Sequence, residues 1–211
     1  SGPLSGCRAY LCFSGGVDVP PVMESRSTYT RARVGGFQGR ALKKGDLLRC
    51  GEPLPLWRKC EGLVCPEALR PAYSPDVPLR VVPGPQDDLF TEKGKETFYG
   101  SDYAVSNSAD RMGYRMDGPE IEHTGAADII SDAIPLGAVQ VPGHGQPIVM
   151  LADRQTTGGY TKIGVVCSVD IAALSQRLPG QKVRFQKIAL DDALAIAREE
   201  AGKREELRRL R

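Results

Sequence analysis

The stretch MLADRQTTGGYTKIGVVC, residues 150–167, organises the rest of the chain. Two apolar runs with the composition of β-strands flank a polar hexad at residues 153–158, and Gly159 follows before Tyr160 restarts the strand pattern. A Gly-Gly pair permits close approach to the backbone or a positive φ angle, and the Asp, Arg, Gln and Thr side chains supply charges, donors and acceptors. The pattern predicts a polar hairpin, which is either a binding loop or an ordinary turn with solvated charges.

The composition favours a soluble, cytoplasmic protein. A length of 211 residues suits one large or two small domains, and the net charge of +2, from 28 basic and 26 acidic residues, does not indicate a nucleic-acid or anionic-membrane partner. No apolar run approaches the roughly 20 residues of a membrane span. Six cysteines are too few for a disulfide scaffold of this length, so reduced thiols are expected.

The spacing of cysteines, histidines and glycines predicts neither a metal site nor a nucleotide site. Cys50, Cys60 and Cys65 fall close together, but a structural zinc site needs four ligands, and His123 and His144 are distant in sequence. No glycine-rich segment has the spacing of a phosphate-binding loop. Any nucleotide would therefore be bound elsewhere.

Proline density and residue periodicity divide the chain into four parts. Eight of the sixteen prolines lie between residues 50 and 85, a density that resists helices and central strands. Alternating apolar residues predict strands at residues 7–14, 79–83 and 180–188, and an apolar stripe predicts a helix from Asp191 onwards. The expected organisation is a first β domain at 1–50, a Pro-rich linker at 51–78, a second β domain at 79–190 and a C-terminal helix at 191–211.

The two halves of the chain share a weak sequence similarity. An apolar strand precedes Gly15-Gly16 and also Gly158-Gly159, and a serine follows nine positions after the second glycine of each pair. Duplicated barrels are the simplest account, with chance similarity of two glycine-rich hairpins as the alternative. Duplication would leave the first barrel incomplete, so we expect a fragment or a first domain that another polypeptide completes.

Two further polar clusters contribute candidate binding residues. Ser25 and Arg26 lie in the run ESRST, and a guanidinium is a preferred fork for a carboxylate or phosphate. Asn107 and Arg111 lie in the run SNSADRMGYR. The alternatives are a capped surface turn for the first run and a strand edge with a turn for the second.

Five ordered segments carry a family resemblance. They are GGVDVPPVMESRSTY (15–29), GGFQGRALKKGD (35–46), PLRVVPGPQDDLF (78–90), SADRMGYRMDGP (108–119) and ADRQTTGGYTKIG (152–164). Together they resemble the C-subunit family of bacterial 5-oxoprolinase, also described as biotin-dependent carboxyltransferase or allophanate hydrolase subunit 2, which is similar to the carboxyltransferase domain of urea carboxylase. The resemblance implies a mostly β fold of tandem cyclophilin-like β-barrels with short helices and a C-terminal helix, the first barrel being incomplete in this chain.

The resemblance also implies an activity, cofactors and partners. The activity is ATP-dependent opening of 5-oxo-L-proline to L-glutamate, in a complex with the B and A subunits of the same enzyme, with ATP and Mg bound by or shared with those partners. The candidate catalytic residues are Asp153, as a general base or to orient Arg154, together with Arg154 and Arg26 as holders of a carboxylate or phosphate. The candidate substrate-binding residues are Gln155, Thr157, Gly158, Gly159, Tyr160, Ser25, Asn107 and Arg111.

Two other functions remain open at this point. One is a carboxyltransferase that moves a carboxylate from carboxybiotin to a urea-like acceptor, because the same polar loop suits a ureido ring. The chain shows no biotin-accepting lysine motif, so the biotin carrier would come from elsewhere. The other is a non-enzymatic regulator that binds a partner and antagonises a kinase inhibitor.

Overall fold

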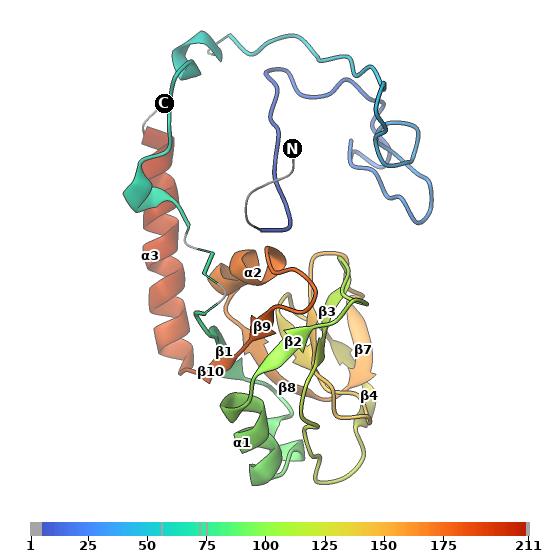
Figure 1. The fold of residues 1–211 in the computed structure, drawn as a ribbon, viewed down its shortest axis with the longest axis vertical. Helices are drawn as coiled ribbons and strands as arrows, with labels where there is room; N and C mark the ends of the chain where they lie inside the picture. The colour runs from blue at the N-terminus through green and yellow to red at the C-terminus, as the bar shows by residue number, and fades with distance from the viewer. Residues whose placement is uncertain (1–5, 56, 72, 75, 210–211) are drawn as a thin grey trace. The chain divides into compact units, whose positions relative to one another are not determined.

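The computed structural model describes residues 6–55, 57–71, 73–74 and 76–209 (Figure 1). The described chain divides into two compact units, one of residues 6–9 and 66–209 and the other of residues 10–65. Residues 51–65, which the sequence places in a linker, fall in the smaller unit.

The larger unit is built mostly from strands. Its strands are β1 (Leu79–Pro83), β2 (Tyr103–Val105), β3 (Gly113–Asp117), β4 (Asp128–Ala133), β5 (Ala138–Gln140), β6 (Ile148–Met150), β7 (Thr157–Tyr160), β8 (Lys162–Val166), β9 (Lys182–Val183) and β10 (Phe185–Lys187). Its helices are α1 (Glu92–Gly100), α2 (Ser168–Ser175) and α3 (Leu190–Arg209), with short 3-10 turns at Glu67–Leu69 and Asp87–Leu89.

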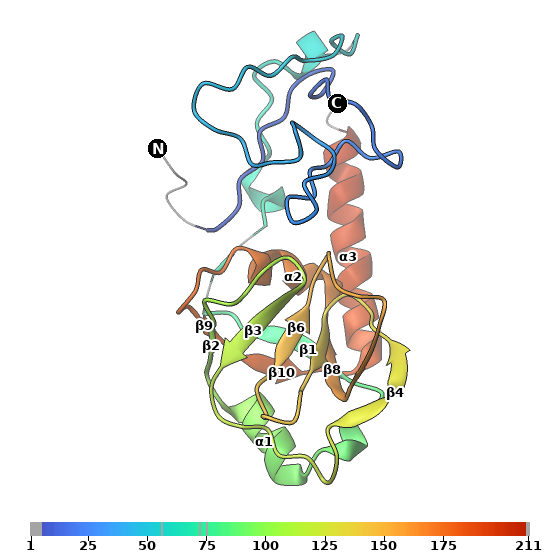
Figure 2. The ribbon, with the colours of Figure 1, turned by 90° about the vertical axis from the view of Figure 1, so that its right-hand side faces the viewer.

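Eight strands form a sheet that closes nearly into a barrel. Their order is β10-β1-β8-β5-β6-β3-β2-β9, and the two edge strands β9 and β10 are separated in the chain only by Arg184. All pairings are antiparallel except β1 with β10. Figure 2 shows α1 near one end of this barrel and α2 near the other. The expected class, a mostly β barrel with short helices and a C-terminal helix, is confirmed.

Aromatic side chains fill the α1 end of the barrel. Thr91 caps α1 by accepting a hydrogen bond from the N–H of Gly94 at 2.9 Å, which fixes where the helix begins. The buried face of α1 then directs Phe98 onto Phe185 of β10, with ring centroids 4.5 Å apart and stacked. Phe98 also contacts Tyr103 of β2, and burial raises the pKa of Tyr103 to about 12. Burying such rings supplies much of the driving force for folding.

Strands β4 and β7 form a separate two-stranded ribbon. Asp132 pairs with Gly158 in this ribbon, and a register shift lies between Asp128 and Asp132. The predicted hairpin at residues 153–159 is therefore too long, because the glycine pair lies inside β7 and neither glycine has a positive φ. Only the shorter segment 151–156 connects β6 to β7.

The helix α3 confirms the expected C-terminal helix, and it begins one residue before the expected start at Asp191, while residues 210 and 211 lie outside the described chain. It begins at Leu190 and continues to Arg209, and it has no buried side chain among the residues that the structure describes. An ion pair between Glu199 and Lys203 at 2.8 Å supports its exposed face, as is typical of a surface helix.

The smaller unit consists of turns, isolated bridges and one 3-10 helix, Trp57–Cys60, among its described residues. Arg40 and Asp46 form a two-pronged ion pair at 2.7 and 2.8 Å, and the guanidinium lowers the pKa of Asp46 to about 2. The strand predicted at residues 7–14 is absent, because the N–H groups of Cys7 and Arg8 donate to the side chain of Gln176 instead of to a neighbouring strand. That this unit is part of a first barrel stays a prediction.

Within the described residues, no helix has both the length and the apolar character that crossing a membrane requires.

Candidate functional site

The loop after β6 carries an exposed ion pair. Arg111 donates to both carboxylate oxygens of Asp153, at 2.7 and 3.0 Å, and the N–H of Asp153 donates to the carbonyl of Arg111 at 2.9 Å. The side chain of Arg111 is 72% exposed. Two predicted residues, Asp153 and Arg111, are thus brought together, and a role of Asp153 in orienting Arg154 stays a prediction.

The side chain of Arg154, the next residue in the loop, forms hydrogen bonds with two backbone carbonyls. Its guanidinium donates to the carbonyl of Ile134 at 2.9 Å and to that of Leu151 at 3.2 Å. These bonds tie the end of β4 to the loop that leads into β7.

Asn107, Ser25 and Arg26 lie in other parts of the chain. Asn107 is exposed in the turn between β2 and β3. Ser25 and Arg26 belong to the smaller unit, where Ser25 accepts a hydrogen bond from Ser27 at 3.1 Å and Arg26 donates to the carbonyl of Val17 at 3.3 Å. A joint role for Arg26 and Asp153 stays a prediction.

Two buried nitrogen atoms lie behind the β4–β7 ribbon. Lys162 of β8 and Gln140 of β5 are partners in one ladder, and each side chain is about 1% exposed. The amide nitrogen of Gln140 has no hydrogen-bond partner among the described residues. Such burial is costly, because amides and ammonium groups lose water when they are buried. We refer to Lys162 Nζ and Gln140 Nε2 as the donor pair.

Asp132 is the counter-ion of this donor pair. Its Oδ2 lies 3.1 Å from Lys162 Nζ and 3.5 Å from the amide nitrogen of Gln86, and its Oδ1 accepts from the N–H of Ala133 at 2.7 Å. The hydrogen bond from Lys162 is the main cause that holds the pKa of Asp132 below its ordinary value, and the N–H of Ala133 adds to it. Gln86 also accepts from the backbone N–H of Lys162 at 3.2 Å. The ion pair therefore extends from the buried Lys162 to a side chain that is 49% exposed.

The predicted residue Gly158 borders the donor pair. A Cβ atom on Gly158 would lie 3.2 Å from Gln140 Nε2, 3.6 Å from Gln155 Nε2 and 2.7 Å from the methyl end of Ile134. The strand therefore packs closely against these side chains at a position where only a glycine fits without a shift of Ile134. Thr157 and Tyr160, on either side of the glycine pair, are exposed, and the backbone of Gly159 approaches Ile129.

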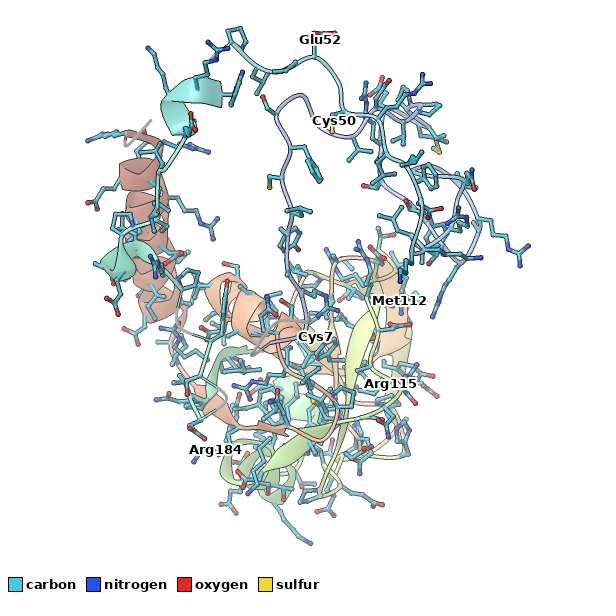
Figure 3. The ribbon with its side chains drawn as sticks, turned by 45° about the horizontal axis from the view of Figure 1, so that its top comes forward. Cys7, Cys50, Glu52, Met112, Arg115 and Arg184 are labelled. Atoms are coloured by element: carbon cyan, nitrogen blue, oxygen red, sulfur yellow. The ribbon has the colours of Figure 1, made fainter. Side chains whose placement is uncertain are left out.

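Preorganised donors of this kind can bind an oxygen atom on which negative charge develops. An ammonium has three donor hydrogens and an amide nitrogen has two, so the single ion pair with Asp132 leaves donor capacity unused. Other cations of the barrel, such as Arg115 and Arg184, lie on its outer surface (Figure 3). The burial of Lys162 is what distinguishes it from these residues, since electrostatic interactions are stronger away from water.

A separate hollow lies beside α1. Its volume is about 490 Å³, and its lining includes the exposed side chains of Lys93, Glu120 and Glu122 together with His123. The ring of His123 contacts that of Phe90 at a tilt, with centroids 4.6 Å apart, and its Nε2 donates to the carbonyl of Val141 at 3.1 Å. Neither the predicted site residues nor the donor pair line this hollow.

No group of three or more His, Cys, Asp or Glu side chains is placed to hold a metal ion within the ranges that the structure covers.

Comparison with solved structures supports the same fold. The chain matches the crystal structure of the K. lactis urea amidolyase with a TM-score of 0.81 at 28% identity, covering 94% of this chain and 13% of that one. It matches the crystal structure of TTHA0988 with a TM-score of 0.59 at 31% identity, covering 82% of this chain and 31% of that one.

Comparison of sequences gives the family. The chain is 37% identical to the C subunit of 5-oxoprolinase from Escherichia coli (strain K12) over 192 residues, which are 91% of this chain and 60% of the relative. It is 29% identical to the urea amidolyase of Saccharomyces cerevisiae, over 91% of this chain and 11% of that protein. Residues 1–187 match the family described as carboxyltransferase domain, subdomain A and B. The chain therefore belongs to the carboxyltransferase domain family, subdomain A and B.

Proposed function

We propose that this chain is part of an ATP-dependent, multi-subunit complex that opens the lactam ring of 5-oxo-L-proline to give L-glutamate. The similarity to a protein named as the C subunit of 5-oxoprolinase supports the proposal. The observation that carries it is the buried donor pair of Lys162 and Gln140, which suits the binding of a carbonyl oxygen. The partners are the A and B subunits of that complex, which bind or share ATP and Mg in the cytoplasm.

The donor pair has a chemical task in this reaction. An unactivated lactam is a poor electrophile, and transfer of a phosphoryl group from ATP to its oxygen creates a leaving group. Water then adds to the carbon and the carbon–nitrogen bond breaks, which leaves an acyl phosphate of glutamate. A second water hydrolyses this acyl phosphate to glutamate and phosphate. Lys162 and Gln140 position the lactam oxygen and stabilise its charge, a type of contact that is worth about 100-fold to 1,000-fold in rate for each donor.

The test is ATP-dependent release of glutamate by the reconstituted complex. Lys162→Met keeps the length of the side chain and removes its charge, and we expect it to lower kcat by about 100-fold. Lys182→Met is the matched control, because Lys182 also lies on a strand and pairs with an aspartate, Asp102 at 2.9 Å, but is exposed. Equal activity of the two variants contradicts the role of Lys162, and the absence of glutamate release by the wild-type complex contradicts the proposed reaction.

A second candidate is carboxyl transfer to a urea-like acceptor. The family name and the structural match to urea amidolyase favour it, and a ureido carbonyl suits the donor pair as well as a lactam carbonyl does. Carboxylation of the acceptor that depends on a biotin-carrying partner, without glutamate release, supports this candidate. Binding of a partner with neither activity points to a regulatory protein.

A further inference from the structure

We infer that Asp132 and the donor pair together recognise the edge of a cyclic amide or cyclic urea, at which a carbonyl oxygen and an N–H group point to the same side. Lys162 and Gln140 donate to the oxygen, and Asp132 accepts from the N–H. The inference rests on the proposed function for the binding of a lactam in this region, and it adds how that ring is selected.

The two donor groups, Lys162 Nζ and Gln140 Nε2, have donor hydrogens to spare for a ligand. Gln140 Nε2 has no partner among the described residues, and Lys162 Nζ has one carboxylate neighbour at 3.1 Å. Each side chain is about 1% exposed, so bulk water does not readily replace the missing acceptor. Gln140 and Lys162 are cross-strand partners, so a ligand oxygen between them would accept from both and relieve the cost of leaving them unpaired.

The acceptor side is Asp132. A carboxylate has about four lone-pair positions. Lys162 and Gln86 approach Oδ2, and Ala133 donates to Oδ1, so one position on Oδ1 remains for a further donor. The side chain is 49% exposed, which leaves that position accessible. Its lowered pKa keeps it ionised, and an ionised carboxylate can only accept hydrogen bonds.

The arrangement of strands places donor and acceptor next to the same glycine, Gly158. Asp132 pairs with Gly158 in the β4–β7 ribbon, and Gln140 Nε2 lies beside the position that a side chain on Gly158 would occupy. Gly158 thus adjoins both the acceptor and one of the donors. A larger residue at this position would press against Ile134 and Gln140.

The local charge selects a neutral group. Lys162 and Asp132 cancel each other, so an amide edge meets a matched donor and acceptor, whereas a ligand carboxylate would meet the negative charge of Asp132. The donor pair therefore binds the ring amide and not the carboxylate of 5-oxoproline. A lactam and a ureido ring share this edge, so both are possible occupants.

The test measures binding of four probes to the reconstituted complex by calorimetry. The probes are 5-oxoproline, its N-methyl derivative, the lactone in which oxygen replaces the N–H, and 2-imidazolidinone as the cyclic urea. We expect 5-oxoproline to bind about 10-fold to 100-fold more tightly than the lactone or the N-methyl derivative, because a hydrogen bond to a charged group is lost. Equal affinity of 5-oxoproline and the lactone, or no binding by any probe, overturns the inference.

A pair of aspartate variants assigns the preference to one residue. Asp132→Asn keeps a carbonyl acceptor for Lys162 and removes the charge, and we expect it to reduce the preference for 5-oxoproline over the lactone by at least about fivefold. Asp102→Asn is the control, because Asp102 is 46% exposed and pairs with Lys182 at 2.9 Å on strand β9. An unchanged preference in Asp132→Asn overturns the inference.

The outcomes separate this inference from the proposed function. Glutamate release by a complex that does not distinguish 5-oxoproline from the lactone leaves the function and removes the inference. Tight, N–H-dependent binding of 2-imidazolidinone without glutamate release supports the inference and indicates that the natural ligand is a cyclic urea.

Discussion

Asp132 and Lys162 form an ion pair 3.1 Å long between two separate sheets, the β4–β7 ribbon and the barrel. Lys162 is buried and Asp132 is half-exposed. The pair therefore joins the ribbon to the barrel next to Gly158. A buried charge is costly without its partner, so the ribbon and Lys162 depend on each other.

The first prediction concerns the pKa of Asp132. Lys162 lowers this pKa, so the carboxylate stabilises the folded state at pH values above its unfolded pKa, and that contribution is lost as the pH falls through the folded value. We expect Lys162→Met to raise the pKa of Asp132, measured by carbon NMR of the carboxyl group. Asp102, whose pKa is lowered by Lys182, serves as the internal control and should not change. An unchanged pKa of Asp132 would show that the ion pair is not formed in solution.

The second prediction concerns the close packing around Gly158. Gly158 has a φ that other residues adopt, so Gly158→Ala is compatible with the backbone. The new methyl group would lie 3.2 Å from Gln140 Nε2 and 2.7 Å from Ile134, whose flexible end can move. We expect substrate affinity to fall at least about tenfold while the melting temperature changes by only a few degrees. Full affinity in a folded Gly158→Ala variant would show that the ligand does not bind there.

The third prediction separates stability from activity at the Arg111–Asp153 ion pair. Because Arg111 is 72% exposed, Arg111→Ala should lower the free energy of unfolding by less than about 1 kcal/mol in chemical denaturation. If Arg111 holds a charged part of the substrate, the same variant raises KM at least tenfold. A variant with wild-type KM would exclude Arg111 from substrate binding.

The fourth prediction is that Arg154 stabilises the fold through its hydrogen bonds to backbone carbonyls. Arg154→Met removes hydrogen bonds to the carbonyls of Ile134 and Leu151, and we expect a loss of about 1–3 kcal/mol in the free energy of unfolding. The measurement is urea denaturation of the variant beside Arg115→Met, whose side chain is exposed on β3. Equal stability of both variants would contradict the structural role of Arg154.

The fold was largely predictable because strand patterns and the family segments agree. The alternating residues at 79–83 and the apolar stripe after residue 190 correspond to β1 and α3. The glycine pair was harder to interpret, because Gly-Gly between apolar runs is typical of a turn. Here Gly158 lies within strand β7, and the close packing of Ile134 and Gln140 leaves no room for a side chain at this position without a shift of Ile134.

The donor pair was not predicted, although Lys162 lies in the stretch 150–167 from which the sequence analysis starts. A lysine in a strand normally faces solvent, and only the packing of the β4–β7 ribbon against the barrel decides that Lys162 is buried. The one available signal was a charged residue at the start of the apolar run KIGVV. The contact with Asp132, 30 positions earlier in the chain, depends on the register of that ribbon, which sequence periodicity does not specify.

The most direct test follows the nitrogen-bound protons of Lys162 Nζ and Gln140 Nε2 by NMR while 5-oxoproline is added to the complex. The account predicts saturable shifts of both signals at one common dissociation constant, with the exposed amide of Asn107 unchanged. Saturating binding of 5-oxoproline that leaves both signals in place would contradict it.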